Sequence, residues 1–430
     1  MWFFVSRLST TMILSVAVLL AASSASGTMD AQVATDAQKV GQLRLSRPVD
    51  HVGKMAREPM IVEHPSGALF VAGYGESMPT LWKSDDRGKT WREVNVGSSA
   101  DGAVGNSDVD LGVAPDGTLY FVTMEFNRKT FEGIGIFVGV SKDAGNKWTW
   151  TTLSKTRFDD RPWIEVAPNG HAHVIWNDGA GVCHAVSGDG GTTWAEGPRV
   201  HSAGGSSHLA IGPDGEVGVR ITPASASGHK LDKDVDLIAV SIDNGKTWRK
   251  SRPPGTRVWM KMHDKALGST AEHIRRWVEP IAWDAQGNLY SLWSQGRTVW
   301  LAQSKDKGQS WREWRILDAL DGAYFPYLAA DGPGELAATW FSGPLGKLQA
   351  NVSRISVPAI GTSPIVRIAA PFALETWMEG EKPDTPRARD TAGEYFPIAF
   401  LRDGSVVVVT TIQDDQKNRF GFSFWRVEQP

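Results

Sequence analysis

The sequence predicts an all-β fold built from repeated antiparallel units. One eight-residue motif occurs five times, 45 glycines and 19 tryptophans are spread over the 430 residues, and short apolar runs alternate with Gly-containing turns. Apolar runs bounded by turn residues at regular intervals are typical of strands rather than helices. Recurrence of one motif every few tens of residues indicates a repeat architecture.

The repeated motif has the pattern S-x-D-x-G-x-[TSK]-W and occurs first at residues 84–91. In a tight turn, Ser and Asp oxygens accept backbone N–H groups, and Gly adopts the positive φ that the turn needs. The Trp that follows adds a large apolar surface to the outgoing strand. Turn chemistry therefore accounts for each fixed position. The later copies start 57, 46, 54 and 63 residues apart, at residues 141–148, 187–194, 241–248 and 304–311.

This motif resembles the Asp box, or BNR motif, of the sialidase-like β-propellers. The resemblance covers most of the chain after its first 25 residues. It implies a propeller of four-stranded antiparallel blades. In that family the box is structural and lies away from the active site, so the motif implies a fold and not a reaction.

Seven strand-turn-strand units can be laid on the sequence. Each unit has an apolar strand, an x-Gly turn and a second apolar strand, and such runs around Asn-Gly or Asp-Gly are strong hairpin signals. Units one to five continue through a third strand into the motif and a fourth strand out of it. We expect seven blades, with six as the alternative because sialidases of this family have six. The units open at residues 58–74, 108–124, 161–176, 206–221, 279–293, 325–340 and 396–412.

The seventh unit lacks a fourth strand, and a spare strand lies at the other end of the chain. Residues 42–46 (QLRLS) form this spare strand. Pairing it with the carboxyl-terminal segment would remove the open sheet edges that invite aggregation. We therefore expect residues 42–430 to form one propeller domain closed by the N-terminal strand, after a disordered lead-in over residues 26–41.

Residues 1–25 have the pattern of a cleaved signal peptide. Arg7 is their only charged side chain, residues 12–22 are mostly apolar, and residues 21–25 (AASSA) offer a small-residue cleavage site. The apolar stretch is too short for a comfortable membrane span. We expect a secreted or periplasmic monomer that does not span the membrane.

Composition argues against several classes of partner. The 45 basic and 48 acidic residues give a net charge of -3 with no run of like charges, so nothing favours nucleic acid or an anionic membrane. The single cysteine, Cys183, cannot form an internal disulfide and is expected to be an inert buried thiol. His171 and His173 have no third ligand at usable spacing, and Gly-rich phosphate loops are absent, so we expect no metal or cofactor.

Charged residues gather at the starts of the expected inner strands. The long insertions 222–234, 255–276 and 376–393 lie on the face opposite the motifs, and loops on a rigid scaffold commonly carry function. The leading residues of the inner strands should meet on that face, at the mouth of the central channel. Crowded carboxylates have split proton affinities and Arg binds anions bidentately, although mutual neutralisation around a water-filled channel would also crowd charges. These residues are Arg57, Glu58, Asp108, Asp110, Asp159, Asp160, Arg161, Ser206, His208, Arg276, Glu279, Tyr324, Glu394 and Tyr395.

Two fragments resemble sialidase sequences more closely. Residues 57–59 (REP) before an apolar strand are similar to the strand that supplies the first arginine of the sialidase triad. The resemblance implies that Arg57 binds a substrate carboxylate. Residues 322–324 (GAY) are similar to the context of the nucleophilic tyrosine, which would make Tyr324 the nucleophile with a carboxylate base such as Glu279. Both Tyr-Phe-Pro repeats, at residues 324–326 and 395–397, could equally be core packing.

Two functions from different classes fit this pattern. The first is an exported, exo-acting glycoside hydrolase that cleaves a terminal, acidic sugar. The second is a non-catalytic propeller that binds a glycan or a protein, favoured by the missing triad positions and the extra blade. The carbohydrate or glycoconjugate would be bound by Arg57, Glu58, Arg161, Arg276 and Tyr395. In an enzyme, the catalytic candidates are Tyr324, Glu279, Asp108 and Asp160.

Overall fold

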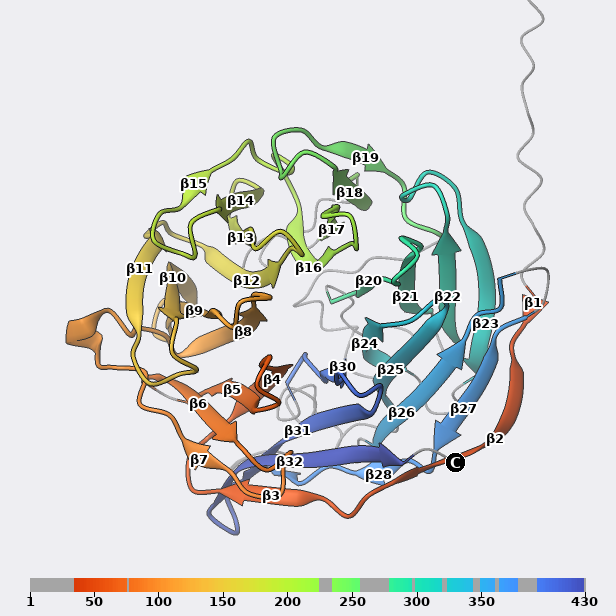
Figure 1. Cartoon of the computed structure of the whole chain (residues 1–430), viewed down its shortest axis with the longest axis horizontal. Helices are drawn as coiled ribbons and strands as arrows, with labels where there is room; N and C mark the ends of the chain where they lie inside the picture. Colours follow the sequence, from red (N-terminus) through yellow and green to blue (C-terminus); the bar gives the residue numbers. More distant parts are fainter. Residues whose placement is uncertain are drawn as a thin grey trace, which may run out of the picture. The chain divides into compact units, whose positions relative to one another are not determined.

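The computed structural model describes residues 35–75, 77–223, 234–255, 278–295, 298–318, 323–342, 349–359, 363–377 and 393–428. Within these residues every regular element is a β-strand except the short 3-10 turn η1 (Ser99–Asp101). The strands form radial sheets arranged in a ring around a central axis (Figure 1). No helix in this part of the chain is long and apolar enough to cross a membrane.

Seven blades make up the ring, which confirms the expected propeller fold. Each blade is a four-stranded antiparallel sheet. Blades one to three comprise, from the axis outward, β4 (Arg57–Glu63), β5 (Leu69–Tyr74), β6 (Pro79–Ser84) and β7 (Arg92–Glu93); β8 (Ser107–Val113), β9 (Leu119–Asn127), β10 (Glu132–Ser141) and β11 (Thr149–Ser154); and β12 (Asp159–Val166), β13 (Ala172–Asp178), β14 (Val182–Ser187) and β15 (Ala195–Glu196).

Blades four to six comprise β16 (Gly205–Ile211), β17 (Val217–Thr222), β18 (Leu237–Ser241) and β19 (Arg249–Ser251); β20 (Ile281–Trp283), β21 (Leu289–Gln295), β22 (Thr298–Ser304) and β23 (Arg312–Asp318); and β24 (Tyr324–Ala330), β25 (Glu335–Ser342), β26 (Gln349–Ser356) and β27 (Ile365–Ala369), with β28 (Phe372–Ala373) also paired to β26. Blade seven comprises β30 (Ile398–Phe400), β31 (Val406–Asp414), β32 (Arg419–Glu428) and β3 (Val49–Val52), with β29 (Thr376–Trp377) paired to β31.

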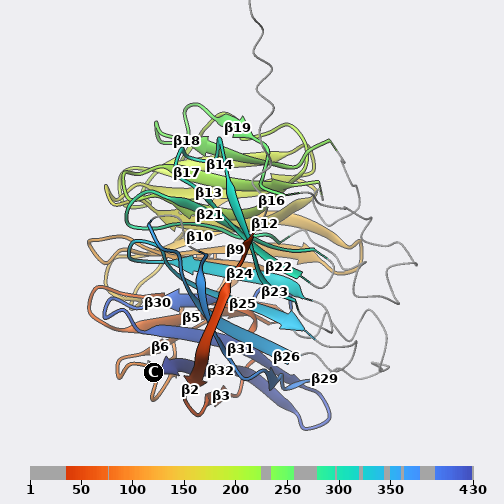
Figure 2. The ribbon, with the colours of Figure 1, turned by 90° about the vertical axis from the view of Figure 1, so that its right-hand side faces the viewer.

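The N-terminal strands run along the outside of the ring and close it (Figures 1 and 2). Strand β1 (Thr35–Asp36) pairs in parallel with β23 of blade five, and β2 (Gln38–Leu45) pairs in parallel with β27 of blade six. The last two paired residues of β2 and all of β3 then pair with β32 of blade seven. The prediction that the N-terminal strand pairs with the carboxyl-terminal segment is therefore confirmed.

The register of this closure differs from the expected one. Most of the fourth strand of blade seven is β3, which lies beyond the predicted residues 42–46. Residues expected to be a disordered lead-in form β1 and the start of β2, because they supply backbone partners to the outer edges of blades five and six. The Asp36 carboxylate also accepts two hydrogen bonds from Arg315, each of 2.8 Å. The rest of the expected lead-in, residues 26–34, and the leader lie outside the described residues.

The five copies of the motif, here called the repeat turns, share one hydrogen-bond pattern. In the first, the Ser84 hydroxyl donates to Asp86 Oδ1 (2.8 Å) and accepts the Gly88 backbone N–H (2.7 Å). Asp86 Oδ1 also accepts the backbone N–H of Thr90 (2.9 Å). The same three bonds recur in the other four turns. The turn chemistry expected from the sequence therefore explains the fixed Ser, Asp and Gly.

The glycine of a repeat turn also lies against the preceding blade. Gly88 has a φ of 87°, and a Cβ placed on it would lie 2.3 Å from the Phe424 ring of blade seven. A Cβ on Gly245, whose φ is 78°, would lie 2.1 Å from the His184 ring of blade three. These positions exclude a side chain for two reasons, the backbone conformation and the contact between blades.

The tryptophans of three repeat turns pack across the same junctions. Trp91 lies edge to face with Phe422 of blade seven, at a centroid distance of 5.1 Å. Trp194 packs similarly on Tyr120 of blade two, and Trp248 on His184 of blade three. Such aromatic pairs contribute about 0.5–1.5 kcal/mol beyond the burial of their surface. The repeat turn is therefore a joint between blades as well as a hairpin turn.

We predict that Asp86→Ala lowers the melting temperature without changing the fold. The substitution removes the acceptor of the bonds from Ser84 and Thr90 that hold the first repeat turn against blade seven. Loss of these turn hydrogen bonds should lower the melting temperature by about 2 to 4 °C in a domain of this size. Differential scanning calorimetry measures it, with Asp85→Ala as the matched control because the Asp85 side chain is 59% exposed. Equal melting temperatures for the two variants would contradict the role of the turn.

Candidate functional site

Bulges at the start of three inner strands set the geometry of the channel mouth. The pairing register shifts between Arg57 and Met60 in β4, and at the equivalent places in β12 and β24. Each shift contains a residue followed by Pro, which cannot donate to the strand ladder. A bulge re-aims the neighbouring side chains. The residues before these prolines have positive φ, a strained conformation that is common at functional sites, and they are Glu58 (47°), Arg161 (46°) and Phe325 (44°).

Six of the predicted site residues are linked by hydrogen bonds or by charge interactions, and we call this group the mouth cluster. They come from blades one, two and three and from the segment that precedes β30 of blade seven. These residues are Arg57, Glu58, Asp108, Asp160, Arg161 and Tyr395.

Glu58 is the most buried carboxyl of the mouth cluster, with 5% of its surface exposed. Its Oε2 accepts a hydrogen bond from the Tyr74 hydroxyl (3.1 Å), and its Oε1 accepts the backbone N–H of Glu394 (2.9 Å). Burial, followed by repulsion from Asp108, raises the pKa of Glu58 to about 7 despite the opposing charge of Arg57. Glu58 therefore exchanges a proton near neutral pH.

Asp108 is the carboxyl of the cluster that solvent reaches, because its side chain is only half-buried. The Tyr395 hydroxyl donates to Asp108 Oδ2 at 3.0 Å. Surrounding protein atoms, followed by repulsion from Asp160, raise the pKa of Asp108 to about 6. The Tyr395 ring packs edge to face on Trp163 at 5.1 Å, which fixes the position of its hydroxyl.

The two arginines of the cluster differ in exposure. Arg161 is 4% exposed, and its Nε lies 3.5 Å from Asp160 Oδ2. The Ser206 hydroxyl donates to the Arg161 carbonyl oxygen at 2.8 Å and so ties blade four to this segment. Arg57 is half-buried, so it is the more exposed of the two arginines. Neutralisation between neighbours, which we kept open from the sequence, thus applies to Arg161.

Glu279 belongs to a separate buried group between blades four and five. Its Oε2 accepts a hydrogen bond from Arg220 at 2.6 Å, and the same guanidinium pairs with Asp236 at 2.6 Å. Arg220 is completely buried, so removing either carboxylate would leave its positive charge incompletely neutralised inside the protein. The role of Glu279 as a carboxylate base stays a prediction, and the structure shows this carboxylate paired with the Arg220 guanidinium.

Tyr324 is placed in the core rather than in the mouth cluster. It is 4% exposed and packs in the same apolar cluster as Phe341 and Phe396, whose rings stack at 4.9 Å. Its role as a nucleophile stays a prediction. Arg276 lies outside the described residues.

The other residues expected at the mouth have local or deeper positions. The Asp159 carboxylate at the start of β12 accepts hydrogen bonds from Ser154 at the end of β11 in blade two and from Thr156 in the connection between the two strands. Asp110 and His208 line a cavity further along the channel. Within the described chain, no group of three His, Cys, Asp or Glu residues is arranged to hold a metal ion.

Sequence reasoning missed Tyr74, which holds the Glu58 carboxyl, and Arg220, which holds Glu279. Tyr74 lies opposite Arg57 in the pairing of β4 with β5. Without the bulge at Pro59, the hairpin register would have paired Tyr74 with a different residue. The Glu-Pro pair was the available signal for this shift.

Several solved β-propellers are similar to this structure. YCF48 from Cyanidioschyzon merolae has a TM-score of 0.52 and 11% sequence identity, over 89% of this chain and 98% of that chain. The GH74 xyloglucanase from Xanthomonas campestris has a TM-score of 0.51 and 14% identity, over 88% of this chain and 55% of that chain. The intramolecular trans-sialidase from Ruminococcus gnavus has a TM-score of 0.43 and 13% identity, over 89% of this chain and 99% of that chain.

At 11% and 14% identity, the likenesses to YCF48 and to the xyloglucanase show the fold. A scan against models of protein families finds no match, and a search of curated protein sequences finds none either. Fold and geometry together define the class of the protein: a seven-bladed β-propeller whose channel mouth holds a charged cluster.

We predict that Glu58→Gln removes part of the pH dependence of stability. A carboxyl whose pKa is raised to about 7 in the folded state, from 4.5, stabilises the protein at low pH, and this contribution is lost as pH rises through about 7. The glutamine does not titrate but keeps an acceptor for the Tyr74 hydroxyl. Between pH 5 and pH 8, the free energy of unfolding of the variant should therefore rise relative to that of wild type by on the order of 1 to 3 kcal/mol.

Urea unfolding at the two pH values measures this difference, with Glu196→Gln as the control because Glu196 is exposed in β15. If Glu58→Gln and wild type lose stability equally between pH 5 and pH 8, the proton on Glu58 has no part in holding the mouth cluster together.

Proposed function

We propose that the protein is an exported, monomeric glycoside hydrolase that removes a terminal, acidic sugar, with the mouth cluster as its active site. One observation carries this proposal: Asp108 is a half-buried carboxyl with a pKa raised to about 6, beside a second carboxyl and an accessible guanidinium. Glycoside hydrolases use a pair of carboxyl groups, one of which keeps a proton for the leaving oxygen.

Each group of the cluster has a role in this proposal. Asp108 donates its proton to the glycosidic oxygen, and the Tyr395 hydroxyl orients the carboxyl through its 3.0 Å hydrogen bond. Asp160, kept near Arg161, supplies the negative charge that stabilises the positive sugar ring in the transition state. Arg57 binds the anionic substituent of the sugar through charge-assisted hydrogen bonds. Tyr324, Glu279 and Arg276 have no assigned step.

The alternative is a non-catalytic propeller that binds a glycan or a protein at the same mouth. The observation that favours it is the burial of Arg161 next to Asp160, which leaves Arg57 as the accessible arginine of the mouth cluster. A ligand held by one accessible guanidinium and several carboxyls needs no chemical step. The two functions share the ligand class and differ in turnover.

We predict that a panel of 4-methylumbelliferyl glycosides will contain a substrate, and that Asp108→Asn lowers its kcat about 100-fold or more. Wild-type kcat/KM should fall as pH rises above about 6, because the Asp108 carboxyl must be protonated to act as an acid. The asparagine variant should lose this limb of the pH profile. Circular dichroism and melting confirm that the variant is folded.

If purified wild type cleaves no glycoside on the panel but binds a glycan array through Arg57, the hydrolase is excluded and the binding function stands. If Asp108→Asn retains full turnover, the acid lies elsewhere in the molecule.

We also predict that Arg57→Ala separates acidic from neutral sugars. Removing a guanidinium that pairs with a substrate carboxylate should weaken an acidic substrate by on the order of 2 to 4 kcal/mol and leave its neutral analogue nearly unchanged. The measurement is kcat/KM for a sialoside or glucuronide against that for the corresponding neutral glycoside. Equal losses for both would show that Arg57 supports the site without contacting the acidic group.

A further inference from the structure

The central channel contains a cavity of about 400 Å³ that is separate in position from the mouth cluster. All seven inner strands contribute to its lining, and the lining continues to residues at their ends next to the x-Gly turns, such as Glu63 and Asp331. The mouth cluster instead lies at the opposite ends of these strands. Arg57 is the first residue of β4, and Asp108 follows the first residue of β8. The cavity is therefore on the side of the repeat turns.

A chain of ring contacts lies between the two sites. Tyr395, which binds Asp108, packs on Trp163 at 5.1 Å, and Trp163 packs on His208 at 4.8 Å. His208 in turn packs on Tyr327 at 5.3 Å, and Tyr327 lines the cavity. These rings make a continuous layer of contacts from the mouth cluster to the cavity. A ligand in the cavity would therefore meet a different set of groups.

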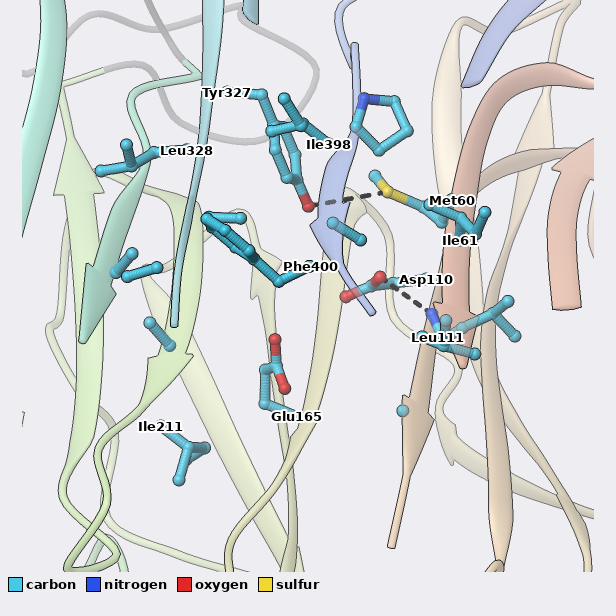
Figure 3. Close-up of a pocket in the computed structure, with 18 of the residues that line it drawn as sticks. Met60, Ile61, Asp110, Leu111, Glu165, Ile211, Tyr327, Leu328, Ile398 and Phe400 are labelled. Atoms are coloured by element: carbon cyan, nitrogen blue, oxygen red, sulfur yellow. Dashed lines mark hydrogen bonds between the residues drawn. The ribbon is translucent and has the colours of Figure 1, made fainter. Parts of the chain in front are cut away.

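Two carboxyls, Asp110 and Glu165, give the cavity its chemistry, and both side chains lie at its interior with Tyr327 and Phe400 (Figure 3). Asp110 is 8% exposed, and its carboxyl accepts the backbone N–H groups of Leu111 (2.8 Å) and Ile164 (2.9 Å). The Glu165 side chain is open to the cavity although protein surrounds the site.

The charges around the cavity are unbalanced. Glu63, Asp110, Glu165 and Asp331 line it, with Arg402 as the guanidinium among the lining residues. Burial raises the pKa of Asp110 to about 7. The protein that surrounds the cavity, followed by repulsion from Asp110, raises the pKa of Glu165 to about 8. A cation in the cavity would relieve this repulsion and favour the ionised carboxylates.

His208 points independently to a ligand. It is 5% exposed and lines the cavity, yet neither ring nitrogen has a hydrogen-bond partner among the described residues. Burial lowers its pKa to about 3, so the ring is neutral and offers one donor and one acceptor. A buried polar group without a partner destabilises a protein, and a ligand that carries a hydroxyl group would satisfy it.

The cation that fits this lining is organic. No arrangement of three metal-ligating side chains is found in the described chain, whereas the Tyr327 and Phe400 rings stand beside the two carboxyls. Aromatic faces and carboxylates together are the environment that recognises ammonium groups. We propose that the cavity binds a small hydroxyl-bearing organic ammonium ion, with the ammonium group between Asp110 and Glu165 and the hydroxyl group at His208. This proposal does not depend on the function of the mouth cluster.

Isothermal titration of the full-length protein tests the proposal with choline as the probe. Its neutral isostere, 3,3-dimethylbutan-1-ol, has the same shape without the charge, and we expect it to bind at least tenfold more weakly. Glu165→Gln should weaken choline at least tenfold, whereas Glu196→Gln on the outer strand β15 should leave it unchanged. Asp108→Asn, which alters the mouth cluster, should also leave choline binding unchanged.

The role of His208 is tested by comparing choline with tetramethylammonium, which has no hydroxyl group. His208→Phe should weaken choline several-fold and leave tetramethylammonium unaffected. Absence of choline binding to wild type, or equal affinity for the neutral isostere, would overturn the proposal. Loss of choline binding in Asp108→Asn together with retention in Glu165→Gln would also overturn it, because the probe would then occupy the mouth.

Discussion

The structure depends on the contact between each repeat turn and the blade before it. The Ser and Asp side chains accept the backbone N–H groups of the turn. The glycine of the turn, which has no side chain, then lies against the neighbouring sheet, as Gly88 lies against Phe424. The Trp that follows then packs across the same junction in three of the turns. Because one short segment both reverses the chain and docks it, adjacent blades keep a fixed relation, and the inner strands can bring charges from four blades to one mouth.

Blades six and seven have no repeat turn, and the N-terminal strands take over the joining there. Strands β1, β2 and β3 pair in turn with blades five, six and seven, so one continuous segment spans the junctions that lack the motif. Backbone hydrogen bonds on the outer edge thus replace side-chain packing on the face. Ring closure at the last junction combines both devices, since the first repeat turn packs on the same β32 that β3 pairs with.

The fold could be predicted from the sequence because turn and strand patterns are local. The contacts of the site depend on residues that are far apart in the sequence. Seven x-Gly turns at Gly67, Gly117, Gly170, Gly215, Gly287, Gly334 and Gly404 all have the positive φ that the pattern requires. The gathering of Arg57, Glu58 and Asp108 at the mouth followed from strand order. The hydrogen-bond partner of each charged group could not be predicted in this way. The bulges shift the pairing register of the inner strands by amounts that the pattern of apolar residues does not encode. The resemblance proposed Tyr324 for the site, and the structure places this side chain in a buried apolar cluster with Phe341 and Phe396.

The pairing of the first strands with the last has a consequence for how the ring is made. During synthesis, β3 emerges before the strands of blades one to six, whereas its partner β32 emerges after them. Early blades can form as they appear, since neighbouring blades are joined by segments close in sequence. The ring can close only after β32 has been synthesised, and until then β3 has no strand of blade seven to pair with. Assembly of the mouth likewise joins early and late parts of the chain, because Glu394 and Tyr395, before β30, hydrogen-bond to Glu58 of blade one and Asp108 of blade two.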